Sequence, residues 1–326
     1  ADPVFDVAIT PNRPDCMGVA GIARDLAAAG LGTFRPHPVP EIAGSFPCPV
    51  EIRSEDPAGC PAFHGRVIRG LRNGPSPEWM QARLKSAGQR PISALVDITN
   101  YVMLAFGRPA HAYDCAKLTG AVVARKARAG ESVVALNEKT YALDPEMTVI
   151  ADDAGVHDIA GIMGGQHSGC SDSTTDVLLE VALFDPETIA ATGRRLNLTS
   201  DARSRFERGV DPGFLDDGLA ILTDLILRIC GGEASEVVRA GVAPATPRRV
   251  AYEPVLVERL GGVAISEPDQ ADILARLGFT VNRVEIGQGR KAWMVDVPGW
   301  RPDIDGAPDL VEEVIRIHGL DRIASA

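Results

Sequence analysis

The sequence has few basic residues for its length. Its 33 Lys and Arg residues are outnumbered by 44 Asp and Glu residues, which gives a net charge of −11 at pH 7. Neutralising the phosphates of a nucleic acid takes clustered Lys and Arg side chains, and the basic residues here are only loosely grouped. This balance argues against strong nucleic-acid binding by the chain on its own.

Cysteines and long apolar runs are also scarce. Six cysteines are scattered along 326 residues without a C-x-x-C pair or a spacing that suits zinc, which predicts reduced and mostly buried thiols. No window approaches the roughly 18 uninterrupted apolar residues of a membrane span. The first residues lack an initiator Met and a secretory signal pattern. We therefore expect a piece of a longer cytoplasmic protein that does not cross a membrane.

Sequence motifs of several common activities are missing as well. The chain has no G-x-x-x-x-G-K-[ST] phosphate loop, no G-x-S-x-G nucleophile turn, no H-E-x-x-H zinc motif and no dinucleotide-binding fingerprint. It also lacks the ATP-binding motifs of class II aminoacyl-tRNA synthetases. These absences argue against amino-acid activation by this chain.

The residues that are present predict a multi-domain α+β protein. An apolar fraction of 45% is enough for a full core, and the length suggests two or three domains. Residues 1–40 are expected to form an N-terminal helical segment, with a helix from Met17 to Ala29 that Asp15 caps. Three prolines between Pro36 and Pro40 then favour an extended connector.

Two further units follow. Residues 41–245 alternate short β-like runs with turns and helices, which predicts mixed α/β structure with antiparallel strands. A Pro/Ala linker at 242–247 leads to residues 246–326, where a strand, two helices, a β-pair and a last helix suggest a small helix-plus-wing domain. In the middle unit we expect strands at 62–68, 121–127, 148–151 and 177–181, and helices at 77–86, 186–195 and 213–230.

The most informative stretch lies between residues 96 and 114. An apolar, β-branched run at 96–103 carries the hydrogen-bonding side chains of Thr99 and Asn100. A Gly/Pro turn then leads to a lone histidine, His111, with a carboxylate three residues later. We expect donors, acceptors and a titratable base at the rim of a strand.

This stretch resembles the editing domain of the bacterial phenylalanyl-tRNA synthetase beta subunit. The resemblance extends over nearly the whole chain, through five segments in the order of that family: 9–15, 99–101, 160–165, 205–211 and 309–314. It implies a central editing domain followed by the helix-plus-wing domain, and hydrolysis of mischarged Tyr-tRNA(Phe). The alpha subunit and tRNA(Phe) are the implied partners, with ATP used only in the intact enzyme.

The chemistry of such a site can be derived from its substrates. Phenylalanine and tyrosine differ by one hydroxyl, which an apolar pocket rejects only weakly. A second site that hydrogen-bonds the phenol discriminates better, because phenylalanine leaves buried polar groups unpaired. By resemblance Glu180 is the acceptor for the phenol, although an ordinary carboxylate at a strand end is the simpler alternative.

Further candidates follow from the same resemblance. His111 is expected to orient water or to contact the ester, although a lone histidine is more often structural. The substrate-binding set is completed by Ala160 and Gly161, where the backbone can approach the substrate closely, and by Arg90, which is expected to contact the end of the tRNA. For the glycine segment the alternative is a tight turn, and for Arg90 it is an ordinary solvated side chain. The expected catalytic set is His111, Thr99, Asn100, Ser200 and Ala202.

Four positions depart from the family pattern, and one of them is Ala110, which replaces a larger apolar residue beside His111. Ser200 stands where a threonine is usual, which keeps the hydroxyl. Arg203 adds bulk near the expected pocket, and Arg108 replaces a glutamine close to His111. We expect the site to be retained, with a hydrolysis rate that is not typical of the family.

The last helix carries a group of acidic residues. Asp309, Glu312 and Glu313 are spaced i, i+3 and i+4, so we expect one helical face to carry all three, with Asp303 just upstream. In the family these positions match a Mg²⁺ site shared with the alpha subunit, and oxygen ligands suit that ion. A favourable interaction with the helix dipole is the alternative. A non-catalytic scaffold or RNA-positioning module is the competing function for the chain as a whole.

Overall fold

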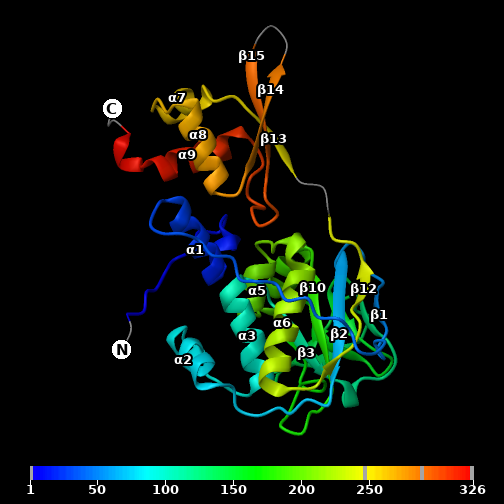
Figure 1. Cartoon of the computed structure of the whole chain (residues 1–326). Coiled ribbons are helices and arrows are strands. Elements are labelled where there is room, and N and C mark those ends of the chain that lie inside the picture. The colour runs from blue at the N-terminus through cyan, green and yellow to red at the C-terminus, as the bar shows by residue number, and fades with distance from the viewer. Residues whose placement is uncertain (1–2, 245–247, 287–289, 324–326) are drawn as a thin grey trace.

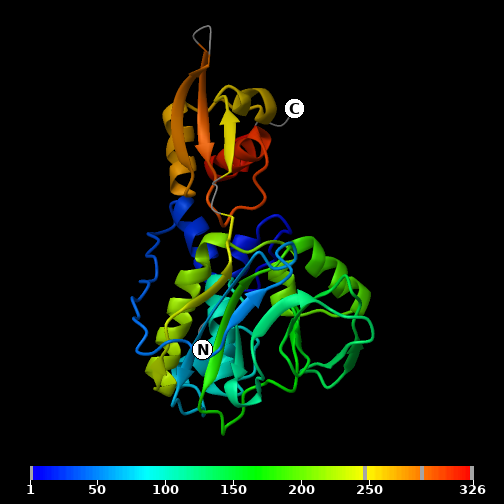
Figure 2. The same ribbon diagram turned by 90° about the vertical axis from the view of Figure 1, so that its right-hand side faces the viewer.

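The structure is a computed structural model that describes residues 3–244, 248–286 and 290–323. It consists of an N-terminal segment, a central unit with two sheets and a C-terminal unit (Figure 1). Helix α1 (Val19–Ala28) lies between the other two units in both views (Figures 1 and 2). Residues 245–247 of the expected linker lie outside the described residues.

The N-terminal helix begins later than predicted. Pro14–Met17 forms a 3₁₀ turn, and Gly18 is extended with φ −133° and ψ 148°, so α1 starts at Val19. The carboxylate of Asp15 does not cap the helix, because it accepts hydrogen bonds from the Arg13 guanidinium at 2.8 and 2.9 Å. The expected helix was therefore right in kind and wrong at its start.

Two five-stranded sheets pack face to face in the central unit. One has the order β1-β4-β7-β8-β9, with β1 parallel to β4 and the other pairs antiparallel. The other is antiparallel with the order β11-β2-β10-β3, and β12 also pairs with β2. The bounds are β1 Ile52–Ser54, β4 Val122–Lys126, β7 Thr148–Ala151, β8 Val156–Ile159, β9 Met163–Gly164, β11 Glu233–Ala234, β2 Ala62–Arg69, β10 Val177–Leu183, β3 His111–Asp114 and β12 Val238–Gly241; a separate pair joins β5 Ser132–Val134 to β6 Thr140–Ala142.

Strand β10 is buried on both faces. Leu178 and Ala182 belong to the core between the two sheets, whereas Leu179 and Val181 face the helices on the outer side. Since side chains alternate along a strand, Glu180 lies on the face that points toward the other sheet. The strand pattern thus places one carboxyl group inside the apolar core.

Helices α3 and α6 cover the outer face of the β11-β2-β10-β3 sheet (Figure 1). The four strands and three helices expected in this unit are confirmed, with ends shifted by one or two residues. The central helices are α2 Glu78–Ser86, α3 Ala94–Phe106, α4 Pro186–Leu196, α5 Asp201–Phe206 and α6 Leu215–Cys230.

The expected strand at 96–103 is wrong, because these residues lie inside α3. Leu95, Ile98 and Val102 are fully buried at a helical spacing of three and four residues. Gly107 ends the helix in the left-handed conformation with φ 69°. Burial against α6 and the sheet outweighs the β propensity of the branched residues.

The C-terminal unit has the predicted order of elements. A three-stranded sheet, β13-β15-β14, packs against three helices around Trp293. Figure 1 shows the β14–β15 hairpin extending away from the central unit. The bounds are β13 Arg249–Tyr252, α7 Leu256–Gly261, α8 Glu267–Arg276, β14 Thr280–Ile286, β15 Arg290–Asp296 and α9 Ala307–His318. Among the described residues, no helix combines the length and apolar character needed to span a membrane.

Ion pairs connect the C-terminal unit to α1. Arg316 of α9 donates to both carboxylate oxygens of Asp25 at 2.8 and 2.9 Å, and also to Glu313. Arg13 reaches the same Asp25 at 2.9 Å. These contacts lower the pKa of the Asp25 carboxyl below its ordinary value, against the effect of its partial burial.

Candidate active site

Two of the predicted site residues face each other across a strand pair. His111 at the start of β3 and Glu180 in β10 are direct partners in the antiparallel register. Both therefore point to the same side of the sheet, toward the core between the sheets. Glu180 is 6% exposed, and the His111 side chain is partly exposed at the edge of this core.

Tyr113 and Asp158 complete a polar cluster with them. The Tyr113 hydroxyl lies within hydrogen-bonding distance of a carboxyl oxygen of Asp158 and of a carboxyl oxygen of Glu180. The other oxygen of Asp158 accepts from the backbone N–H of Gly165 at 2.8 Å. We call His111, Tyr113, Asp158 and Glu180 the carboxyl–tyrosine cluster.

Burial changes the ionisation of this cluster. Removal from water, followed by the nearby Asp158 carboxylate, raises the pKa of Glu180 to about 8. Burial and the two carboxyl groups raise the pKa of Tyr113 well above its ordinary value. Burial and the neighbouring carboxylate therefore favour the protonated, neutral form of Glu180.

His111 has an imidazole nitrogen that is available for chemistry. Its Nε2 atom is buried and makes no hydrogen bond within the described part of the chain. The imidazole packs edge-on against the Tyr113 ring, with centroids 4.6 Å apart. A Cβ atom on Gly164 would come within 2.7 Å of the imidazole Cε1, so the histidine fits only beside a glycine.

Packing against neighbouring side chains explains why position 161, where a substrate was predicted to approach the backbone, is a glycine. This residue has φ 67°, a conformation that favours glycine. A Cβ atom here would meet Phe184, Ile189 and Phe206 at 2.8–3.1 Å, and Ala160 is fully buried. The tight turn that was the alternative interpretation is thus present, and a substrate contact at these two residues stays a prediction.

Ser200 and Ala202 lie at the start of α5. The Ser200 hydroxyl donates to the carbonyl of Ile162 at 2.6 Å and accepts from the Arg203 N–H at 3.0 Å, so it caps the helix and ties it to the turn after Gly161. Ala202 packs on the core between the sheets. A direct catalytic part for either residue stays a prediction.

The structure does not bring Thr99, Asn100 and Arg90 into the cluster. The Thr99 hydroxyl donates to the Val96 carbonyl of its own helix at 2.8 Å, and α3 packs on the outer face of the sheet. The expected place of Thr99 and Asn100 at a strand end is therefore wrong. Arg90 is exposed, in a loop that a hydrogen bond of 2.8 Å from Gln89 to Asp201 holds beside α5.

Both arginines that depart from the family pattern are bound to the protein. Arg203 donates to Glu207 at 3.0 Å and to the Leu198 carbonyl, and it fills the space next to Gly193. Arg108 is buried and donates to the backbone carbonyls of Ala182 and Asp211. Neither contacts the carboxyl–tyrosine cluster through a hydrogen bond.

The four acidic residues proposed for Mg²⁺ do not fit a metal. Asp303 and Glu313 both pair with Arg301, at 2.8 and 2.5 Å, and Asp309 accepts from the backbone of residues 305 and 306. Asp309, Glu312 and Glu313 lie in α9 at the expected helical spacing, but Glu312 is exposed whereas Glu313 is buried. In residues 3–244, 248–286 and 290–323, no group of three or more His, Cys, Asp or Glu side chains is arranged to hold a metal ion.

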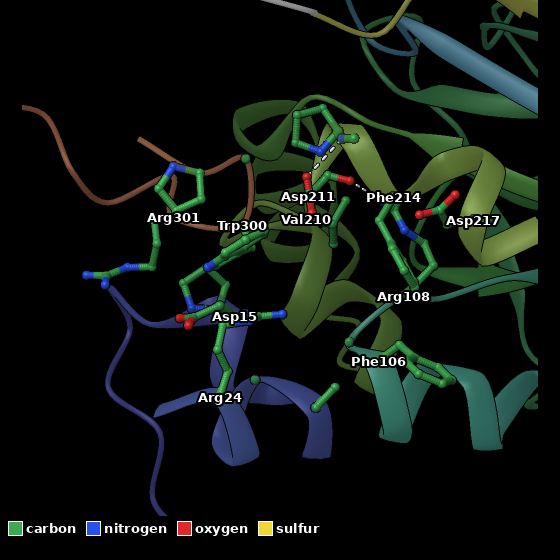
Figure 3. Close-up of a pocket in the computed structure, with 18 of the residues that line it drawn as sticks. Asp15, Arg24, Phe106, Arg108, Val210, Asp211, Phe214, Asp217, Trp300 and Arg301 are labelled. Carbon is green, nitrogen blue, oxygen red and sulfur yellow. Dashed lines mark hydrogen bonds between the residues drawn. The ribbon is translucent and has the colours of Figure 1, made fainter. Parts of the chain in front are cut away.

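A cavity of about 840 Å³ lies elsewhere, where the three units meet (Figure 3). Arg24 of α1 stacks on Trp300 of the C-terminal unit, with the guanidinium carbon 4.1 Å from the ring centre. Phe106 and Phe214 form part of its wall on the central unit (Figure 3). No residue predicted for the site from the sequence lines this cavity.

Sequence reasoning missed Tyr113 and Asp158, whereas Gly164 was expected, with Gly161 and Gly165, to allow close backbone approach. Tyr113 follows His111 by two residues, so a correctly placed strand at 111–114 would have put both on one face. Asp158 lies in a short strand, where its burial beside Glu180 depends on the packing of two sheets. No local pattern carries that information.

Comparison with known proteins gives two domain matches and many relatives. Residues 59–231 match the B3/4 domain, and residues 250–320 match the tRNA synthetase B5 domain. These matches lie within the second and third expected segments, whose boundaries stay predictions. The phenylalanine–tRNA ligase beta subunit of Novosphingobium aromaticivorans is 70% identical over 325 residues, and that of Zymomonas mobilis is 50% identical over 324.

The matches cover all or 99% of this chain but 40% of each of these relatives. The chain thus spans about two fifths of their length. An N-terminal fragment of the phenylalanyl-tRNA synthetase beta subunit from Pyrococcus horikoshii aligns at 17% identity with a TM-score of 0.46, covering 97% of this chain and 90% of that chain. The resemblance predicted from the motifs is confirmed by the close relatives, and the chain belongs to the B3/4 domain family.

Proposed function

We propose that this chain is the editing part of a phenylalanine–tRNA ligase and hydrolyses the ester of Tyr-tRNA(Phe). The observation that carries the proposal is the pairing of His111 with Glu180 across one strand pair. This pairing puts an available imidazole nitrogen beside a buried carboxyl group. The similarity to phenylalanine–tRNA ligase beta subunits along the whole chain supports the same reaction.

Glu180 supplies the selectivity in this proposal. A tyrosyl phenol donates a hydrogen bond to the buried carboxyl group, which replaces the bonds that the phenol made to water. A phenylalanyl ring offers no donor and leaves one oxygen of the carboxyl group without a partner, at a cost of about 1–3 kcal/mol. The difference favours hydrolysis of the tyrosyl ester over the correct product.

His111 supplies the proton transfer. Its Nε2 takes a proton from water as the oxygen of that water attacks the ester carbonyl. The bond between the carbonyl carbon and the ribose oxygen then breaks, and the same nitrogen returns the proton to the ribose oxygen. Free tyrosine and intact tRNA are the products, and no cofactor is consumed.

The partners follow from the same proposal. The net charge of −11 means that other parts of the ligase hold most of the tRNA, and the alpha subunit carries amino-acid activation with ATP. Arg90 lies at the surface beside α5, where it can meet the end of the tRNA. We derive no step through Mg²⁺, because its expected ligands are engaged by arginines and backbone groups.

Hydrolysis of preformed Tyr-tRNA(Phe) by the full ligase tests the proposal. His111→Ala is expected to slow this hydrolysis at least tenfold while phenylalanine charging stays near normal. His37→Ala is the matched control, because this exposed histidine lies outside the cluster. A wild-type enzyme that leaves Tyr-tRNA(Phe) intact would favour a non-catalytic scaffold instead.

A further inference from the structure

Tyr113 is the one member of the carboxyl–tyrosine cluster that contacts both acids. It is fully buried, and its hydroxyl is bound by Oδ2 of Asp158 and by Oε2 of Glu180. The protein therefore already places a phenol against the carboxyl group that is proposed to recognise the phenol of the substrate.

Hydrogen counting fixes the directions of these bonds. A phenol has one hydrogen, and two ionised carboxylates would need two. Both hydrogen bonds can form when Tyr113 donates to Asp158 and a protonated Glu180 donates from Oε2 to the phenol oxygen. The backbone N–H of Gly165 donates to the remaining oxygen of Asp158, so both Asp158 oxygens act as acceptors in this arrangement.

This arrangement leaves one oxygen of Glu180 for a ligand. Oε1 has no hydrogen-bond partner in the part of the chain that the structure describes. With the proton on Oε2, Oε1 is a carbonyl oxygen that can only accept a hydrogen bond. A tyrosyl hydroxyl provides that hydrogen, whereas phenylalanine does not.

We propose that Tyr113 is a positioning residue for selectivity, which holds the proton of Glu180 on Oε2 and so presents Oε1 as a neutral acceptor to the tyrosyl phenol. The proposal rests on the proposed editing function and extends it to the protonation state of the recognising group. A neutral acceptor also avoids two adjacent negative charges in the core between the sheets.

Several groups around Glu180 determine when it ionises. Those on the packed elements are Asp158 on β8, His111 and Tyr113 on β3, and the buried Cys60 before β2. The Asp158 charge raises the pKa of Glu180. A phenol oxygen that accepts a hydrogen bond from the protonated acid also favours its neutral form, so removing either group should favour ionisation of Glu180.

Glu180→Gln separates the neutral acceptor from a charged one. The glutamine amide reproduces the protonated acid, because its NH₂ group can donate to Tyr113 while its oxygen faces the ligand. In the full ligase, Glu180→Gln is expected to keep the ratio of Tyr-tRNA(Phe) to Phe-tRNA(Phe) hydrolysis within about threefold of wild type. Glu180→Ala is expected to lower that ratio about tenfold or more.

Tyr113→Phe tests the hydroxyl while keeping the ring in the core. It is expected to lower the hydrolysis ratio about tenfold. The ratio should also change with pH around an apparent midpoint, which moves down relative to wild type in Tyr113→Phe, where the acceptor for the Glu180 proton is lost, and in Asp158→Asn, where the neighbouring charge is lost. A purely structural part for Tyr113 would leave that midpoint in place.

The outcomes distinguish this inference from the function on which it rests. A wild-type ligase that does not hydrolyse Tyr-tRNA(Phe) overturns both. If wild type hydrolyses it, but Glu180→Gln is as unselective as Glu180→Ala, a charged acceptor is needed and the inference about Tyr113 is wrong. If Tyr113→Phe has the same hydrolysis ratio and the same pH midpoint as wild type, the inference about Tyr113 is also wrong, whereas the proposed editing function stands.

Discussion

The Nε2 atom of His111 lies 3.7 Å from Oδ2 of Asp158. This separation is too long for a hydrogen bond and short enough for the carboxylate to attract a protonated imidazole. The nitrogen is therefore near a negative charge without being bound to it. A base that must take up a proton and then return it benefits from a nitrogen that no hydrogen bond occupies.

Gly164→Ala is expected to disturb His111 more than the fold. The new Cβ would lie 2.7 Å from the imidazole Cε1, so the imidazole must move. We expect Tyr-tRNA(Phe) hydrolysis to fall about tenfold or more, since small misplacements of a catalytic group are costly. Rate measurements on the full ligase check this. Gly74→Ala is the control, because a Cβ there meets nothing within 4 Å; equal rates in both variants would contradict the account.

Arg316→Met is expected to loosen the junction of α1 with the C-terminal unit. It removes the arginine that donates hydrogen bonds to both Asp25 and Glu313, which we expect to destabilise the protein by about 2 kcal/mol. Chemical unfolding at pH 7 measures the change. Arg228→Met is the control, because its side chain is 71% exposed and its ion pair is worth about 0–1 kcal/mol.

The same variant has a defined pH dependence. Arginines hold the pKa values of Asp25 and Glu313 below their ordinary values of 3.8 and 4.5. Depressed carboxyl pKa values stabilise the fold above those ordinary values, and this contribution is lost as the pH falls through the lowered values. The stability difference between wild type and Arg316→Met should therefore shrink below about pH 4. A difference that grows on acidification would contradict this assignment.

The chain alone is expected not to charge tRNA with phenylalanine. Its sequence has none of the recognisable nucleotide-binding motifs, so it offers no site for the activation step. Formation of Phe-tRNA from phenylalanine, ATP and tRNA by the purified chain measures this directly. Robust charging would overturn the assignment of activation to the alpha subunit.

The sequence predicted the elements whose local signals agree with their packing. The strand at 148–151 is exact, and the helix at 186–196 begins at Pro186 after the cap Asp185, as expected for proline in a first turn. Asp185 accepts from the N–H of Thr188 at 2.8 Å. In these segments, local composition and tertiary packing favour the same structure.

Prediction failed where packing decides against composition. The β-branched run in α3 forms a helix because its apolar residues meet α6 and the sheet at helical spacing. The buried Asp97 binds the Ile92 N–H and the Ser76 hydroxyl, which anchors the start of this helix. The contact between Ser76 and Asp97 joins residues 21 positions apart, so it cannot be predicted from a short window of sequence.

The candidate site was predictable in part for the same reason. His111 and Glu180 were found by resemblance, and the register of β3 with β10 brings them together. Tyr113 could have been derived from strand periodicity, but Asp158 enters only when the two sheets stack. The raised pKa of Glu180 depends on that stacking, so it could not be derived from the sequence.

Hydrolysis of preformed Tyr-tRNA(Phe) and Phe-tRNA(Phe) by the full ligase, in wild type, Glu180→Ala and His111→Ala, tests the central claim most directly. We predict that Glu180→Ala lowers the preference for Tyr-tRNA(Phe) by about one to two decades, because the polar test for the hydroxyl is removed. His111→Ala should slow hydrolysis while phenylalanine charging stays near normal. Unchanged hydrolysis of both substrates in both variants would contradict the proposed site.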